Sequence, residues 1–382
     1  MKKEWWLTEV RIKKDWWLAT GVTLTTIAAA LGLIRWFAPQ LLGIPIDLQM
    51  VQVSERVEPF FENVFRKEHR NPNAFQLKDP YTNVRSVPLL SDDGSVGPHD
   101  LLGFRNQQIT NNPEIITIGD SQTYGNGVRL ADNWPSQLAG MMRRKPSSVY
   151  NMSAGGWGAV QYLDMFDKAI IFKPRIIIVA FYTGNDPDET VSMVYAVDRW
   201  ASLRPENRPD LNDRPRFPGF PVPASEMWRV IFSDRTAVIF TPSLRLVSND
   251  NKHTTVRLGY QIMSEVARRM DVTARDHNVR LIFTVIPTKE LVYAARMQRD
   301  RVPLLPEYKT LVNREQENIS RFASAIRQLK NSEYVDLVVS LQNSCLIDTK
   351  LYPAGPDGHP REPGHRVIAK SIEAVIRKHL VQ

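Results

Sequence analysis

Five short runs of apolar, largely β-branched residues recur from residue 114 onward, with helical patterns between them. The runs are EIITIG at 114–119, VYNMS at 149–153, RIIIVAFY at 175–182, RLIFTVIP at 280–287 and YVDLVV at 334–339. Strands that are apolar on both faces are typical of a parallel sheet covered by helices. The pattern therefore predicts an α/β fold with helices on both faces of the sheet, at 134–144, 161–172, 255–277, 314–330 and 364–380.

The N-terminal region predicts a membrane anchor. Residues 16–34 carry no charge, and at about 1.5 Å per helical residue they are long enough to cross a bilayer. Basic residues precede this stretch, and Trp16, Trp17 and Trp36 flank it. The positive-inside rule then predicts a cytoplasmic segment at 1–15, a transmembrane helix at 16–36 and a periplasmic or extracellular remainder. Two alternatives are a buried core helix and a signal peptide cleaved near the alanine run 28–30.

Two further segments follow the anchor. Residues 37–111 are interpreted as a stalk and lead-in, and residues 112–382 as the main domain. Within that domain, residues 187–251 form an insertion that contains eight prolines. Part of its sequence reads RPENRPDLNDRPRFPGFPVP. Proline disfavours helix interiors and central strands, so the insertion is predicted to be irregular, as lids and binding loops are.

Composition excludes several classes of protein. The single cysteine, Cys345, rules out disulfides within the chain and zinc or iron–sulfur sites built from several thiolates. The net charge of +8 is spread along the chain without a recognition motif, so we predict no binding of nucleic acid. We predict no metal and no cofactor, because the chain has neither the H-E-x-x-H spacing nor a complete nucleotide-binding glycine motif.

Polar blocks follow three of the predicted strands, and a fourth block precedes the last helix. They are Gly119-Asp120-Ser121, the run from Asn151 to Gly158, Gly184-Asn185-Asp186 and Asp357-Gly358-His359. Ligands of open parallel sheets bind at the carboxyl ends of the strands, so these blocks are expected to meet there.

The residue types in these blocks indicate acyl transfer. Ser121 would act as the nucleophile, His359 as its general base, and Asp357 as the carboxylate that orients the imidazole. The amides of Ser121 and Gly156, with the side chain of Asn185, would form the oxyanion hole.

Each role has a simpler alternative. Ser121 could be only a helix N-cap, and the glycines and Asn185 only turn residues. His365 competes with His359, and Asp348 competes with Asp357.

Two further interpretations concern the surroundings of these blocks. Tyr124 and Trp157 are predicted to bind substrate, with simple packing as the alternative. Lys289 and Glu290, after the fourth predicted strand, could reach the substrate region, but the default interpretation is a solvated ion pair.

The four blocks, in this order, resemble the SGNH hydrolases, also called GDSL lipases and esterases. Ser121, Gly156, Asn185 and His359 match the four residues for which that family is named. One departure is that Pro356 occupies the position of the usual D-x-x-H aspartate, which leaves Asp357 in a D-x-H block. A D-x-H block is also found in the alginate O-acetyltransferase-like branch. The resemblance implies a flavodoxin-like three-layer α/β/α sandwich around a parallel five-stranded sheet.

These features predict a membrane-anchored serine esterase that cleaves small acyl esters, O-acetyl esters of carbohydrate in particular. One alternative is an O-acetyltransferase that uses the same acyl-enzyme to modify exopolysaccharide or cell-wall sugars. A second is an anchored scaffold without catalytic activity that binds glycan or protein. The sequence gives no indication of oligomeric state.

Overall fold

The computed structural model describes residues 76–380 except residues 80, 81, 146, 147, 208, 220, 348 and 349. The predicted cytoplasmic segment and membrane anchor, and residues 37–75 of the predicted stalk, lie outside the described residues. Among the described residues, no helix combines the length and apolar character needed to cross a bilayer.

The central sheet has five parallel strands, as the apolar runs predicted. They are β3 (Ile115–Gly119), β4 (Val149–Asn151), β5 (Ile176–Tyr182), β8 (Arg280–Ile286) and β9 (Ser332–Asp336). Their order across the sheet is β4-β3-β5-β8-β9, with parallel pairing throughout. This is the flavodoxin-like order, in which the chain reverses direction across the sheet between β3 and β5. Ligands of such sheets bind outside the carboxyl ends of the strands at that reversal.

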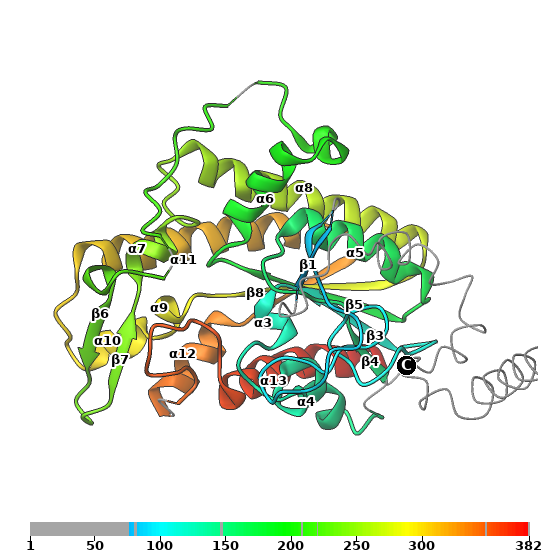
Figure 1. Ribbon diagram of the computed structural model, residues 1–382, viewed down its shortest axis with the longest axis horizontal. Coiled ribbons are helices and arrows are strands. Elements are labelled where there is room, and N and C mark those ends of the chain that lie inside the picture. Colours follow the sequence, from blue (N-terminus) through cyan, green and yellow to red (C-terminus); the bar gives the residue numbers. More distant parts are fainter. Residues whose placement is uncertain are drawn as a thin grey trace, which may run out of the picture. The chain divides into compact units, whose positions relative to one another are not determined.

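Helices cover both faces of the sheet (Figure 1). One face carries α5 (Ala159–Ile171), α6 (Asp186–Ala196), α8 (Thr254–Asp276) and α11 (Pro306–Arg327). The other carries α4 (Trp134–Met141), α12 (Val338–Ile347) and α13 (Glu362–Leu380). Every residue of β3 and β5 is buried, which explains why these strands are apolar without alternation. The predicted three-layer arrangement is therefore confirmed.

The last predicted strand extended too far. Residues 338–339 begin α12, because β9 ends at Asp336 and its carboxylate accepts a hydrogen bond from the amide of Val338 at 2.9 Å. An aspartate that caps an amide in this way favours the start of a helix. Shorter helices follow other strands: α3 (Ser121–Tyr124), α9 (Lys289–Val292) and α10 (Ala294–Arg299).

The proline-rich insertion is more regular than predicted. It contains almost all of α6, the antiparallel hairpin of β6 (Trp228–Ile231) and β7 (Ala237–Phe240), and α7 (Pro242–Leu246). Pro187 and Pro242 each lie in the first turn of a helix, where the missing N–H has no intrahelical acceptor to lose. Short 3₁₀ segments lie at Leu130–Asp132, before the insertion, and at Asp198–Leu203 and Ala224–Glu226 within it.

The lead-in packs on the loop that follows β4. A hairpin of β1 (Gln76–Asp79) and β2 (Asn83–Ser86) opens the described chain. The side-chain amide of Gln76 donates to the carbonyl of Gly155 at 2.9 Å, and the indole of Trp157 donates to the carbonyl of Val84 at 2.7 Å. These contacts place the hairpin against the predicted oxyanion loop.

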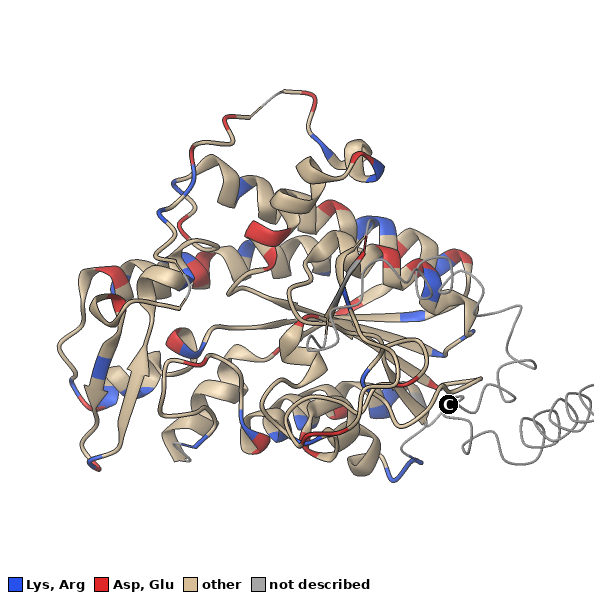
Figure 2. Cartoon of the chain, in the orientation of Figure 1, with Lys and Arg blue, Asp and Glu red and all other residues tan. Residues whose placement is uncertain are grey.

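Charged residues of both signs are interspersed along the helices on the two faces of the sheet (Figure 2). Many of them pair within one helix, as Glu265 does with Arg268 and Arg269 on α8. The view therefore shows basic residues mixed with acidic ones rather than gathered on one face.

Candidate active site

Three side chains from two distant parts of the chain form a hydrogen-bonded series at the carboxyl end of the sheet. Nε2 of His359 lies 2.9 Å from Oγ of Ser121, and Nδ1 of His359 lies 2.7 Å from Oδ1 of Asp357. These are the distances at which a general base can take a proton from a nucleophile while a carboxylate orients it. The structure thus brings the sequence-predicted nucleophile, base and carboxylate together.

Ser121 is positioned by the tight turn between β3 and α3. Asp120 caps the helix, because its side chain accepts from the amide of Gln122 at 2.9 Å. Gly125 ends the helix in the left-handed region, with φ of 86°, where glycine is favoured. The cap belongs to Asp120, so the hydroxyl of Ser121 is left to face the histidine. Burial raises the pKa of Asp120 to about 6.

Asp357 supports His359 through one oxygen. Its Oδ1 accepts from the backbone amide of His359 at 3.0 Å as well as contacting Nδ1. Burial by itself raises the pKa of Asp357, but the hydrogen bonds and charge of His359, together with the charge of Lys289, lower it overall. The carboxylate is therefore kept ionised, which is the form that stabilises an imidazolium.

Lys289 holds the loop that carries these two residues. Its ammonium donates to the carbonyls of Pro353 at 2.8 Å and Gly355 at 2.6 Å, and to Ile239 on the neighbouring hairpin at 3.0 Å. The residue is 1% exposed, and so is Glu290. The interpretation of this pair as solvated is wrong, because the ammonium exchanges water for backbone carbonyls. Lys289 is a positioning residue that the sequence analysis did not find.

The burial of Lys289 predicts a pH-dependent stability. Burial lowers its pKa from 10.5 to about 8, so between these values the unfolded chain binds more protons than the folded chain. The free energy of unfolding therefore rises with pH in this window on account of this group. Relative to Lys289→Met, the wild type is expected to gain about 2 kcal/mol between pH 7 and pH 9.5, measured by urea unfolding at both values. A constant difference between the two proteins would contradict this assignment.

The predicted oxyanion donors lie after three neighbouring strands, β3, β4 and β5, at the carboxyl end of the sheet. Gly156 adopts φ of 76°, a conformation that favours glycine, and Asn185 is half-buried at the start of α6. Within the described residues, neither the amide of Ser121 nor that of Gly156 donates a hydrogen bond. The side-chain NH₂ of Asn185, the group that would donate to an oxyanion, also donates to none of the described residues. Donors that the fold leaves unused beside a nucleophile can stabilise a developing oxyanion.

Replacing Asn185 with alanine tests this assignment. We expect kcat for 4-nitrophenyl acetate to fall by about 10²-fold with little change in KM, because the donor is used mainly in the transition state. The exposed Asn212 provides a matched control, since Asn212→Ala removes the same amide from the insertion. A loss confined to KM would show instead that Asn185 binds the ground state.

The structure places the remaining candidates in the core. Tyr124 and Trp157 are each 1% exposed, and both polar atoms are engaged: the hydroxyl of Tyr124 lies 2.6 Å from Nε2 of His99, and the indole of Trp157 bonds to Val84. Neither ring is free to meet a substrate. His365 is fully buried on α13, where burial lowers its pKa to about 3, so this competitor of His359 packs in the core. Asp348 lies outside the described residues.

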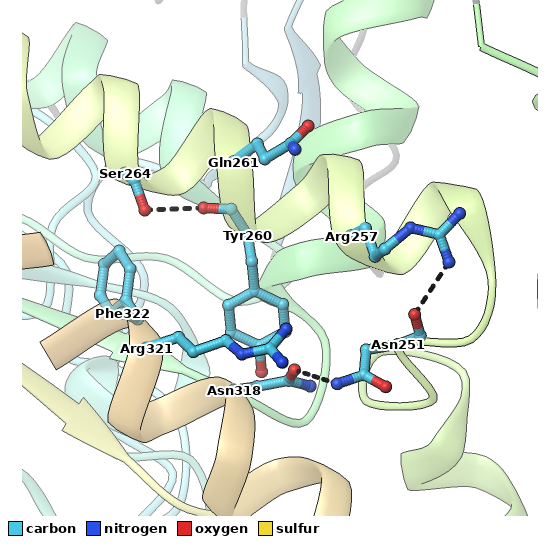
Figure 3. A pocket seen from close by; sticks show the side chains of 8 residues that line it. All are labelled: Asn251, Arg257, Tyr260, Gln261, Ser264, Asn318, Arg321 and Phe322. Atoms are coloured by element: carbon cyan, nitrogen blue, oxygen red, sulfur yellow. Dashed lines mark hydrogen bonds between the residues drawn. The ribbon is translucent and has the colours of Figure 1, made fainter. Parts of the chain in front are cut away.

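The described residues also contain a pocket away from Ser121, His359 and Asp357. A pocket of about 410 Å³ lies between α8 and α11 (Figure 3). Its polar side chains engage one another and the backbone: Asn251 donates to Asn318 at 3.1 Å, and Arg257 donates to the carbonyl of Asn251 at 3.0 Å. Ser121, His359 and Asp357, which form the catalytic triad proposed here, do not line this pocket. Across the described part of the chain, no three His, Cys, Asp or Glu residues are grouped in a way that could hold a metal ion.

Comparison with known proteins gives similarities of structure only. No protein-family model matches the sequence, and no curated protein matches it. Among solved structures, the chain is similar to a putative lipolytic protein of the G-D-S-L family from Desulfitobacterium hafniense, with 14% identity, a TM-score of 0.39 and coverage of 69% of this chain and 99% of the other.

Two more solved structures cover a similar share of the chain. An acetylxylan esterase from Geobacillus stearothermophilus, solved as a catalytic mutant, has 14% identity, a TM-score of 0.37 and coverage of 70% and 94%. The esterase EstA from a Pseudoalteromonas species has 12% identity, a TM-score of 0.36 and coverage of 70% and 100%.

Proposed function

We propose that this chain is a serine esterase of the SGNH type that cleaves small acyl esters through an acyl-enzyme on Ser121. The observation that carries the proposal is the continuous series from Ser121 through His359 to Asp357, with contacts of 2.9 and 2.7 Å. In the first step, His359 takes the hydroxyl proton as Ser121 attacks the ester carbonyl, and it returns the proton to the leaving alkoxide. In the second step, His359 activates a water that releases the acid.

Access of water favours hydrolysis over transfer. The side chain of His359 is 27% exposed and that of Asp357 is 50% exposed, so the base is open to solvent. A transferase has to exclude water from its acyl-enzyme in favour of an aligned acceptor. The open base is the reason to place esterase before transferase.

Polar groups beside Ser121 favour a short acyl group and a hydroxyl-rich alcohol. A Cβ atom at Gly155 would lie 3.7 Å from Cβ of Ser121. It would lie 3.4 Å from the side-chain nitrogen of Gln76 and 3.9 Å from that of Asn126. A long acyl chain needs an apolar channel, whereas amides suit the hydroxyls of a sugar. Together with the D-x-H block, this supports O-acetyl esters of carbohydrate as the substrate class.

The experiment follows two products at once. The chain is incubated with 4-nitrophenyl acetate, with and without an oligosaccharide acceptor, while nitrophenol release and acceptor mass are measured. Nitrophenol release that depends on Ser121, with no change in acceptor mass, is the expected result. An acceptor that gains an acetyl group would establish the transferase. A folded sample that releases no nitrophenol and whose Ser121 does not react with a fluorophosphonate would favour the scaffold.

We also propose that residues 16–36 anchor the protein in a membrane, with the catalytic domain outside the cytoplasm. The support is the uncharged stretch, its tryptophan flanks and the basic residues before it. The full chain is expected to stay with membranes through a carbonate wash, whereas a chain that starts at residue 37 is expected in the supernatant. Release of the full chain by carbonate would contradict the anchor.

A further inference from the structure

Arg245 reaches the catalytic loop from the proline-rich insertion. It lies on α7, which packs beside α11 (Figure 1). A Cβ atom at Gly358, the residue between Asp357 and His359, would lie 2.6 Å from Nη2 of Arg245. The absence of a side chain at Gly358 therefore leaves room for a guanidinium next to the triad.

Within the described residues, this guanidinium has no hydrogen-bond or ion-pair partner. Nε of Arg245 is buried and unpartnered. Other buried arginines are held: Arg105 donates to the carbonyls of Gly97 and Val128, both at 2.7 Å, and Arg296 pairs with Asp234 at 2.7 Å. Withdrawing a charged donor from water without a partner costs free energy. Such a group at the edge of an active site is suited to bind a ligand.

A second unpartnered donor lies at the same point. The hydroxyl of Tyr182, at the end of β5, is buried without a hydrogen bond to the described residues. It would lie 3.3 Å from the same Cβ atom at Gly358, and the ring of Tyr182 is 5.9 Å from the guanidinium carbon of Arg245. A guanidinium and a hydroxyl that converge in this way match the two oxygens of a carboxylate.

The charges around Arg245 favour an anion with a single charge. Burial by itself lowers the pKa of Arg245, and nearby acidic groups, Tyr182, Glu290 and Asp357 first among them, raise it overall. The carboxylates of Glu290 and Asp357 form no ion pair with Arg245, but they would repel a dianion such as a phosphate monoester. A ligand carboxylate, with a single negative charge, is repelled less by these groups than a dianion is.

We propose that Arg245 and Tyr182 form an anion subsite beside His359, and that the preferred substrate is an acyl ester whose alcohol carries a carboxylate. The alcohol side is assigned because His359 must return its proton to the leaving alkoxide, which places that part of the ester next to the loop containing Gly358. The subsite rests on the proposed esterase function for its role in catalysis, but its binding of a carboxylate does not require turnover.

The test compares two esters that differ in one charge. They are 4-nitrophenyl acetate and 5-acetoxy-2-nitrobenzoate, the same ester with a carboxylate on its leaving group. The wild type is expected to show a kcat/KM about ten-fold higher for the carboxylate ester, as one charge-assisted pair would give. Arg245→Gln is expected to lose this preference through KM, and Arg245→Lys to keep part of it. Arg229→Gln, which removes an exposed arginine from β6, is expected to keep all of it.

Binding is measured separately from turnover. Calorimetry of 5-acetoxy-2-nitrobenzoate with the Ser121→Ala chain, with and without Arg245→Gln, reports the subsite even if the esterase proposal fails. Weaker binding in the Arg245→Gln background supports the subsite. The subsite proposal is overturned if Arg245→Gln leaves binding unchanged, or if it lowers kcat/KM for both esters by the same factor. A residue that only positions the loop would affect the two esters alike. Stronger competition by phenyl phosphate than by benzoate would overturn the carboxylate assignment.

Discussion

Replacing His359 with alanine is expected to lower kcat/KM for 4-nitrophenyl acetate by about 10⁴-fold or more, because the variant lacks the base that takes the Ser121 proton. Nε2 of His359 is 2.9 Å from the serine hydroxyl, and the loop that carries the imidazole is tied to the backbone by Lys289. No reorganisation is then needed before proton transfer, and the full effect of a general base is lost with the ring. The fall in kcat/KM is measured from initial rates of nitrophenol release over a range of enzyme concentrations.

A matched variant separates chemistry from folding. His277 lies exposed at the end of α8, so His277→Ala is expected to keep the wild-type rate and melting temperature. His359→Ala should also unfold at the wild-type temperature, since its ring is partly exposed. Asp120 is the competing base, because its Oδ2 lies 3.3 Å from the same hydroxyl. Retained activity in His359→Ala that disappears in Asp120→Asn would assign the role to Asp120.

The parts of the fold that the sequence predicted correctly depend on local patterns. Runs such as 175–182 are apolar because both faces of the strand are covered, and that requirement is visible residue by residue. The catalytic groups follow because parallel strands end at one edge of the sheet, so blocks after different strands must meet there. Ser121 and His359 are 238 positions apart, yet both were found because each lies at the end of a recognisable element.

The features that were missed depend on long-range contacts with no local pattern. The ammonium of Lys289 bonds to carbonyls more than 60 positions later, and backbone carbonyls carry no sequence signal. Tyr124 was predicted to bind substrate because it follows the nucleophile, but His99 and the lead-in cover it. The prolines of the insertion predict irregular structure, whereas Pro187 and Pro242 occupy the first turns of helices. That distinction depends on where each helix begins.

Replacing Asp357 with asparagine is expected to lower kcat/KM by about 10³-fold, less than the loss of the histidine. Oδ1 of Asp357 accepts from both the amide and Nδ1 of His359, and an asparagine oxygen can accept the same two hydrogen bonds. The imidazole would keep its orientation and its Nδ1–H tautomer, but the negative charge that stabilises the imidazolium would be gone. Asp357→Ala removes the orientation as well, so its loss is expected to approach about 10⁴-fold.

A comparison of the two substitutions at this position shows which of these effects dominates. Asp276→Asn, an exposed position on α8, is expected to leave the rate unchanged. If Asp357→Asn is as slow as Asp357→Ala, the amide has turned its nitrogen toward the ring and imposed the wrong tautomer. If it keeps the full rate, the orienting carboxylate is another residue, and Asp348 is the next candidate in the sequence.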